Sequence, residues 1–194
     1  EKLAVTITQK FPKHPFGWKV LGAVLKQIGR LNESLVVSQK SVELKPQDAE
    51  THNNLGVVLQ ELTKFEEAEV SYRQAIALKP DYSDAHNNLG VTLQKLARLD
   101  EAEASYRQAI ALNPFSTKSH LNLGNTLLEL SRLDEAEASY RETISLNPEF
   151  PEVHNNLGIM LLELHRLDEA EISFRRVIEL NRDYTDIHNK LLKC

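Results

Sequence analysis

Apolar residues along this chain follow helical spacing, and short polar breaks interrupt them at regular intervals. In the segment 49–82, four of them share one helix face at positions i, i+3, i+4 and i+7: Leu55, Val58, Leu59 and Leu62. A polar break at Thr63 and Lys64 separates this stretch from a second periodic stretch, which begins near Glu66. Pro80 ends the second stretch, because proline cannot continue the helical hydrogen-bond ladder. The pattern predicts a helix, a turn, a second helix and a second turn.

The same pattern recurs with a fixed period of 34 residues. Three residue types mark the period: glycine at Gly22, Gly56, Gly90, Gly124 and Gly158, proline at Pro12, Pro46, Pro80, Pro114 and Pro148, and histidine at His52, His86, His120, His154 and His188. A fixed period of this length is the signature of a repeat array, in which each unit packs only against its neighbours and the stack presents one long surface. We therefore expect an all-α solenoid of helix-turn-helix units, whose activity is to hold a partner.

Small and large residues are paired where the two helices of a unit should meet. Gly56 and Ala68 lack bulk, so the helix axes can approach closely there, and Tyr72 supplies the large side chain that fills the remaining space. Glycine inside a helix costs about 0.5–1 kcal/mol relative to alanine, so its recurrence indicates a packing role. The first 34-residue repeat has Ser38 where the later repeats have tyrosine or phenylalanine, and we expect looser packing there.

A leucine-glycine pair, a small residue, an aromatic residue, a second small residue and a proline, in this order, resemble the tetratricopeptide repeat. In one unit they are Leu89, Gly90, Ala102, Tyr106, Ala109 and Pro114. The resemblance divides the chain into a single array: the end of an earlier second helix at 1–14, five repeats at 15–48, 49–82, 83–116, 117–150 and 151–184, and the start of a further first helix at 185–194. It implies a right-handed superhelical α-solenoid whose first helices line a concave groove.

The family often has an aromatic residue at the fourth position of a repeat, where this chain keeps only Trp18 and has histidine in the later repeats. A row of histidines suggests metal binding. Successive copies should lie about one repeat apart, however, which is far beyond the roughly 2 Å metal–nitrogen bond. We therefore interpret the histidines as packing residues with one ring nitrogen hydrogen-bonded, and we expect no metal site.

Asparagines repeat with the same period on the predicted first helices. One position holds Asn54, Asn88, Asn122 and Asn156, and the preceding position holds Asn53, Asn87 and Asn155. Under the resemblance the first of these positions points into the groove, where amide donors and acceptors can pair with the backbone of an extended peptide. The row is similar to the asparagine ladder in the tetratricopeptide superhelix of O-GlcNAc transferases. The alternatives are a solvated helix surface or hydrogen bonds to neighbouring repeats.

Residues three and six positions after each of these asparagines share the same helix face. They are Val57 and Gln60, Val91 and Gln94, Asn125 and Leu128, and Ile159 and Leu162. With Leu121, the apolar ones gather toward the C-terminal half, where they mark an interaction site or are covered by a further repeat or domain. The candidate peptide-binding residues are Asn53, Asn54, Asn87, Asn88, Asn122, Asn125, Asn155, Asn156, Leu121, Leu128, Ile159 and Leu162.

Composition argues against several other classes of function. The net charge is −5, from 23 Lys and Arg against 28 Asp and Glu, and the chain lacks the basic stripe that nucleic-acid binding needs. It also has no apolar run long enough to span a bilayer, so we expect neither a nucleic acid nor a membrane as partner. Cys194 is the one cysteine, which excludes an intrachain disulfide and is compatible with a reducing, cytoplasmic compartment.

The residues suggest no catalytic constellation and no cofactor site, so the predicted function is a non-catalytic scaffold that binds a protein or peptide in its groove. Two alternatives stay open. The repeats can be the substrate-recognition part of a larger transferase similar to O-GlcNAc transferases. They can also self-assemble into a homo-oligomer by end-to-end stacking, since both ends break off within a repeat and leave apolar helix faces uncovered.

Overall fold

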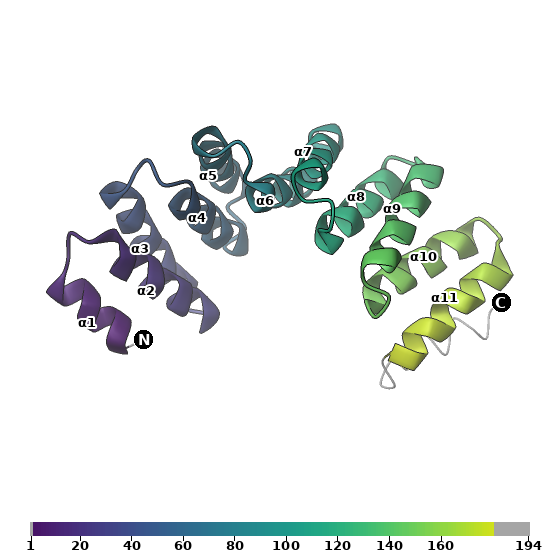
Figure 1. Cartoon of the computed structure of the whole chain (residues 1–194), viewed down its shortest axis with the longest axis horizontal. Coiled ribbons are helices and arrows are strands. Elements are labelled where there is room, and N and C mark those ends of the chain that lie inside the picture. Colours follow the sequence, from purple (N-terminus) through teal and green to yellow (C-terminus); the bar gives the residue numbers. More distant parts are fainter. Residues whose placement is uncertain (1, 181–194) are drawn as a thin grey trace. The chain divides into compact units, whose positions relative to one another are not determined.

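The computed structural model describes residues 2–180, and in these residues the secondary structure is entirely α-helical (Figure 1). In chain order the helices are α1 (Lys2–Lys10), α2 (Pro15–Gln27), α3 (Leu31–Leu44), α4 (Ala49–Glu61), α5 (Phe65–Leu78), α6 (Ser83–Lys95), α7 (Leu99–Leu112), α8 (Thr117–Glu129), α9 (Leu133–Leu146), α10 (Pro151–Glu163) and α11 (Leu167–Leu180). Each predicted repeat therefore holds one pair of helices, which confirms the helix-turn-helix pattern. The predicted helix start at 185–194, His188 and the segment after α11 lie outside the described residues.

The chain falls into two compact units, Glu1–Leu112 and Asn113–Cys194. In the first unit the helices of each repeat pack as a pair, α2 with α3, α4 with α5 and α6 with α7, and each pair contacts the next. In the second unit α8 packs with α9 and α10 packs with α11, and α9 contacts α10. Each unit is thus a stack of helical pairs, and the all-α solenoid class predicted from the sequence is confirmed.

The turn between the two helices of every repeat uses one left-handed residue. Gly29 has φ of 78°, and the equivalent positions in later repeats have φ of 57–59° although they are not glycines: Thr63, Ala97, Ser131 and His165. The next residue closes the turn. The Lys64 N–H, for example, donates to the Leu59 carbonyl at 2.9 Å, a bond that caps free carbonyl groups at the end of the first helix. The sequence indicated a polar break here but not this conformation.

The predicted close approach between glycine and aromatic residue is present in four repeats. A Cβ atom added at Gly56 would lie 2.6 Å from the Tyr72 ring, and one added at Gly90 would lie 2.6 Å from the Tyr106 ring. The aromatic side chains at this position are fully buried: Tyr72, Tyr106, Tyr140 and Phe174. Burial raises the pKa of Tyr72 above its usual value. Its hydroxyl donates to Gln60 Oε1 at 3.2 Å.

The predicted loose packing of the first repeat is also present. Ser38 occupies the aromatic position there, and it lines a cavity of about 130 Å³ between α2, α3 and α4. The small core beside it consists of four buried residues with three half-buried neighbours: Ala4, Leu21, Leu25 and Val37, packed against Val5, Trp18 and Val20.

The repeated histidines bind the backbone, as predicted. The ring Nε2 of His52 lies 2.9 Å from the Pro46 carbonyl oxygen, and His86, His120 and His154 make the same bond to the proline six residues before each of them. In the first repeat the Trp18 Nε1–H donates to the Pro12 carbonyl at 2.9 Å. Histidine and tryptophan therefore have the same role at this position, because the ring N–H of each donates a hydrogen bond from the first helix to the turn before it.

Arginine and glutamate side chains connect the second helices of consecutive repeats. In the second unit Arg166 donates to Glu137 of the preceding repeat and, at 2.7 Å, to Glu169 of its own repeat. Hydrogen bonds from Arg166 hold the pKa of Glu137 below its usual value, although partial burial opposes this. In the first unit Arg98 makes the equivalent bonds to Glu69 and Glu101.

These bonds predict a pH dependence of stability. Because the pKa of Glu137 is lower in the folded than in the unfolded chain, the bond stabilises the fold above the unfolded pKa of about 4.3 and loses that contribution as pH falls through the folded pKa. We expect Arg166→Met to lower the free energy of unfolding at pH 7 by no more than about 1 kcal/mol, since Arg166 is partly exposed. The difference from wild type should be smaller at about pH 3, below the unfolded pKa, than at pH 7. Urea unfolding at both pH values measures it, and an equal difference at both would contradict the assignment.

Candidate functional site

The first helices of the repeats form the closer-packed row within each unit. Cα atoms of α4 lie within 8 Å of both α2 and α6 in the first unit, and those of α10 lie within 8 Å of α8 in the second. Within the described part of each unit, consecutive second helices do not approach this closely. Such a difference is what curvature produces, because the helices on the inner side of a curved stack lie nearest to one another. The first-helix row is therefore the inner side of each unit, where the sequence placed the candidate residues.

In the first unit, two asparagines from neighbouring repeats are hydrogen-bonded to each other. Asn88 Nδ2, on α6, donates to Asn53 Oδ1, on α4, at 3.1 Å. Asn53 is only 6% exposed, so it serves the contact between repeats and does not belong to an accessible surface. Asn88 is half-buried, so part of this residue remains accessible. One of the alternatives drawn from the sequence, a hydrogen bond to the neighbouring repeat, is thus realised at Asn88.

The second unit has the same kind of bond at a different pair of positions. Asn156 Nδ2, on α10, donates to Asn125 Oδ1, on α8, at 2.9 Å. The same Asn125 oxygen accepts the Tyr140 hydroxyl at 2.8 Å, so Asn125 connects a buried ring to the inner row. In the first unit Gln60 makes the equivalent connection, because its Oε1 accepts hydrogen bonds from both Tyr72 and Thr92. The sequence placed Gln60 and Asn125 on the right face but did not predict these contacts.

The other candidate residues divide by their exposure. The remaining asparagines are half-buried on the first helices: Asn54, Asn87, Asn122 and Asn155. Leu128, Ile159 and Leu162 are also half-buried, and they add apolar surface to the inner row of the second unit. Leu121 is different, since it is 4% exposed and belongs to the core of its unit. The accessible candidates therefore exclude Asn53 and Leu121 and retain the others.

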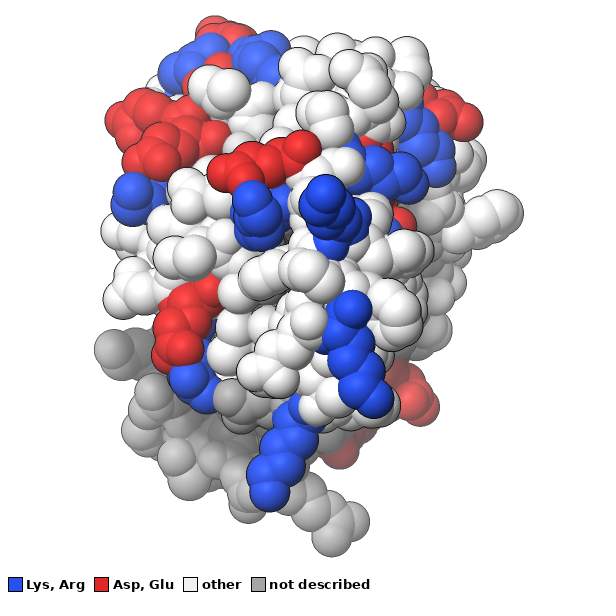
Figure 2. All heavy atoms as spheres, turned by 90° about the vertical axis from the view of Figure 1, so that its left-hand side faces the viewer, with Lys and Arg blue, Asp and Glu red and all other residues white. Residues whose placement is uncertain are grey.

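Charged side chains flank the inner row in the first unit. Lys19 pairs with Glu50, and Lys26 Nζ lies 3.6 Å from Glu61 Oε1, so each lysine of α2 meets a glutamate of α4. Figure 2 shows the side of the molecule on the left of Figure 1, where acidic and basic side chains are interspersed and uncharged residues lie between them. A surface of this kind offers local ion pairs to a partner and does not present a field of one sign.

Within residues 2–180, no three His, Cys, Asp or Glu side chains gather as metal ligands would. None of the helices in this part of the chain combines the length and hydrophobicity that a membrane span requires. The inner row offers amide groups, half-buried aliphatic side chains and paired charges. Such groups can hydrogen-bond a peptide backbone and cover its apolar side chains.

Two family models of the tetratricopeptide repeat match the chain, one over residues 47–114 and the other over residues 121–184. No curated protein sequence matches it.

Several solved structures are similar to the whole fold. PilF of Pseudomonas aeruginosa is 24% identical with a TM-score of 0.80, and the match covers 86% of this chain and 76% of that one. YrrB, described as a TPR protein with an unusual peptide-binding site, is 19% identical with a TM-score of 0.74, and the match covers 96% of both chains. TTC0263, a TPR protein of Thermus thermophilus, is 24% identical with a TM-score of 0.74, over 93% of this chain and 98% of that one. At these identities the likeness concerns the fold.

Proposed function

We propose that this chain, which belongs to the tetratricopeptide repeat family, binds an extended peptide of a partner protein along the first helices of its repeats. Proteins of this family generally act as protein-interaction scaffolds, and this is the general function of the chain. The proposal adds the surface and the mode of contact. Surface amides of the first helices pair with the peptide backbone, and Leu128, Ile159 and Leu162 contact its apolar side chains.

The observation that carries the proposal is the hydrogen bonding of the asparagines between repeats. An asparagine amide has two N–H donors, and the bond from Asn88 to Asn53 uses one of them. The bond from Asn156 to Asn125 does the same. Each of these two amides is thus held in one orientation while it retains a donor. A fixed donor loses less conformational entropy on binding than a free one, which favours affinity. YrrB, a relative of the same fold, also has a peptide-binding site by its description.

A variant with Asn54, Asn88, Asn122 and Asn156 all changed to alanine tests the proposal. A hydrogen bond contributes about 0.5–1.5 kcal/mol net, and about 1.4 kcal/mol corresponds to a tenfold change in affinity. We expect the variant to bind peptides selected on the wild type from a random library at least tenfold more weakly. Fluorescence anisotropy measures the affinity, and circular dichroism checks that the variant remains folded.

The matched control changes exposed amides of the second helices, in the double variant Gln74→Ala and Gln108→Ala. Its peptide affinity should equal that of the wild type. If the asparagine variant is folded and keeps its affinity, or if the control loses as much, the first-helix amides are not the contact surface.

Two alternative functions are substrate recognition within a larger transferase and self-association. A transferase that presents its substrate on these repeats would use the same first-helix row, so the asparagine variant would lower its affinity for protein substrates. Self-association is favoured by three strongly exposed apolar side chains in the N-terminal part of the first unit: Leu3, Phe11 and Phe16.

A further inference from the structure

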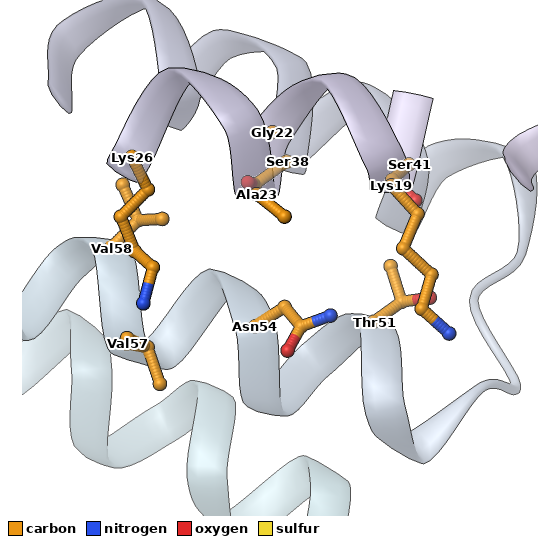
Figure 3. A pocket seen from close by; sticks show the side chains of 10 residues that line it. All are labelled: Lys19, Gly22, Ala23, Lys26, Ser38, Ser41, Thr51, Asn54, Val57 and Val58. Atoms are coloured by element: carbon orange, nitrogen blue, oxygen red, sulfur yellow. The ribbon is translucent and has the colours of Figure 1, made fainter. Parts of the chain in front are cut away.

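Comparison with the other repeats indicates which chemical group fits the cavity of the first repeat. It lies between α2, α3 and α4, and Figure 3 shows the side chains that surround it. In the second repeat, the Tyr72 ring packs on Gly56 of the first helix, and its hydroxyl reaches Gln60. Gln60 also bonds Thr92 of the next repeat. Three positions are thus associated with the Tyr72 ring: Gly56 and Gln60 on α4 contact it directly, and Thr92 on α6 bonds the same Gln60 oxygen.

The same three positions line the cavity in the first repeat. They hold Gly22, Lys26 and Val58, each 34 residues before Gly56, Gln60 and Thr92. Ser38 stands where Tyr72 would stand. The cavity is therefore the space that an aromatic ring fills in every later described repeat. Its volume of about 130 Å³ is close to the roughly 150 Å³ at which an apolar cavity binds benzene.

An unpaired hydroxyl lies at the inner end of this space. Ser41 is 1% exposed, and its Oγ has no hydrogen-bond partner, which is exceptional among the buried side-chain polar atoms of residues 2–180. Buried polar groups normally have a partner, because leaving one unpaired costs about 1–3 kcal/mol. In the second and third repeats the equivalent residues are alanines, Ala75 and Ala109, which need no partner. The Ser41 hydroxyl is therefore available to a polar group that enters the cavity.

The mouth of the cavity lies on the proposed peptide surface. Asn54 and Val57, which line the cavity, are half-buried on α4, and Ala23 on α2 is exposed. Figure 3 shows Asn54 and Val57 on one helix facing Ala23 and Lys26 on the other across the open space. A ring that enters from this side points its far edge toward Ser38 and Ser41. Its direction is opposite to that of Tyr72, which enters from the second helix.

We infer that this cavity binds a tyrosine or phenylalanine side chain of the peptide, in the place that the chain's own aromatic residues fill in the other repeats. The inference rests on the proposed function, since it gives the bound peptide an aromatic anchor at the first repeat. A tyrosine is preferred, because its hydroxyl reaches Ser41 and removes the unpaired polar group. A buried aromatic anchor in a pocket, surrounded by polar contacts, is a common centre of binding energy in interfaces.

The first test uses p-cresol, the side chain of tyrosine, and toluene, the side chain of phenylalanine. We expect p-cresol to cause saturable shifts in the NMR methyl signals of Val57 and Val58 at about millimolar concentration, with tighter binding than toluene. Ser38→Tyr should fill the cavity, raise the melting temperature and abolish these shifts. Ser145→Tyr, at an exposed serine of α9, is the matched control and should change neither. Ser41→Ala should remove the preference for p-cresol while toluene still binds.

The second test uses the selected peptides, each paired with a copy in which the aromatic residue is alanine. We expect the alanine copy, and the Ser38→Tyr protein, to lower affinity at least tenfold. Loss of the fold in Ser38→Tyr, absence of p-cresol shifts, or peptide affinity that Ser38→Tyr leaves unchanged would each overturn the inference. The last outcome would leave the scaffold function standing, whereas failure of the wild type to bind any peptide would contradict that function itself.

Discussion

Changing Tyr106 to alanine should lower the free energy of unfolding of the repeats around it by about 3–5 kcal/mol, the range for truncation of a large buried aromatic residue. The side chain is fully buried against Gly90, and its hydroxyl donates to Gln94. Truncation therefore leaves a large cavity and removes the hydrogen bond from the ring to Gln94. Urea unfolding followed by circular dichroism measures the loss.

Two controls distinguish the contribution of the aromatic ring from that of any side chain at this repeat position. Tyr106→Phe keeps the ring and should cost only about 1 kcal/mol, the contribution of one hydrogen bond; Phe174 occupies the equivalent position in the fifth repeat. Ser38→Ala alters the same position in the first repeat, where no ring is present, and should change stability by less than about 1 kcal/mol. If Tyr106→Ala cost no more than Ser38→Ala, the aromatic residues would not be what holds the repeats together.

Changing Gly90 to alanine is the second large effect, and here a usually favourable substitution should destabilise. Alanine is better than glycine within a helix by about 0.5–1 kcal/mol. The added Cβ would lie 2.6 Å from the Tyr106 ring, however, and such overpacking typically costs about 1–3 kcal/mol. Because the ring is enclosed on all sides, we expect a net loss of about 1–2 kcal/mol, measured by the same unfolding experiment.

The first repeat offers the matched substitution, Gly22→Ala. The nearest atom to the added Cβ is the Ser38 hydroxyl oxygen at 3.0 Å, and this hydroxyl can rotate into the neighbouring cavity. Helix propensity should then dominate, and stability should be unchanged or higher by up to about 1 kcal/mol. Equal losses at Gly22 and Gly90 would show that the ring does not set the spacing of the helices.

Much of the fold could be predicted from the sequence because its determinants are local and repeated. The spacing of Leu55 to Leu62 defined one helix, Pro80 marked the end of the next, and the period copied both along the chain. The pairing of Gly56 with Tyr72 followed from their sizes. The histidines were correctly predicted to be hydrogen-bonded, since one ring of modest size at a helix surface readily finds a backbone carbonyl.

The candidate site was predicted less completely, because its details depend on contacts between repeats. Periodicity placed Asn88 on the inner face but could not show that it donates to Asn53, which required the position of one repeat on the next. The same reason explains why Asn53 and Leu121 are buried although their neighbours are accessible. Ser38 indicated loose packing, yet only the structure shows a cavity with an unpaired Ser41 hydroxyl inside it.

Mapping a bound peptide by NMR tests the central claim most directly. The account predicts that a library-selected peptide shifts the side-chain amide signals of Asn54, Asn88 and Asn156 and the methyl signals of Leu128, Ile159 and Leu162. It also predicts unchanged signals for Val36 and Val70, which are strongly exposed on the second helices. Shifts confined to second-helix residues, with the first-helix amides unchanged at saturation, would contradict the account.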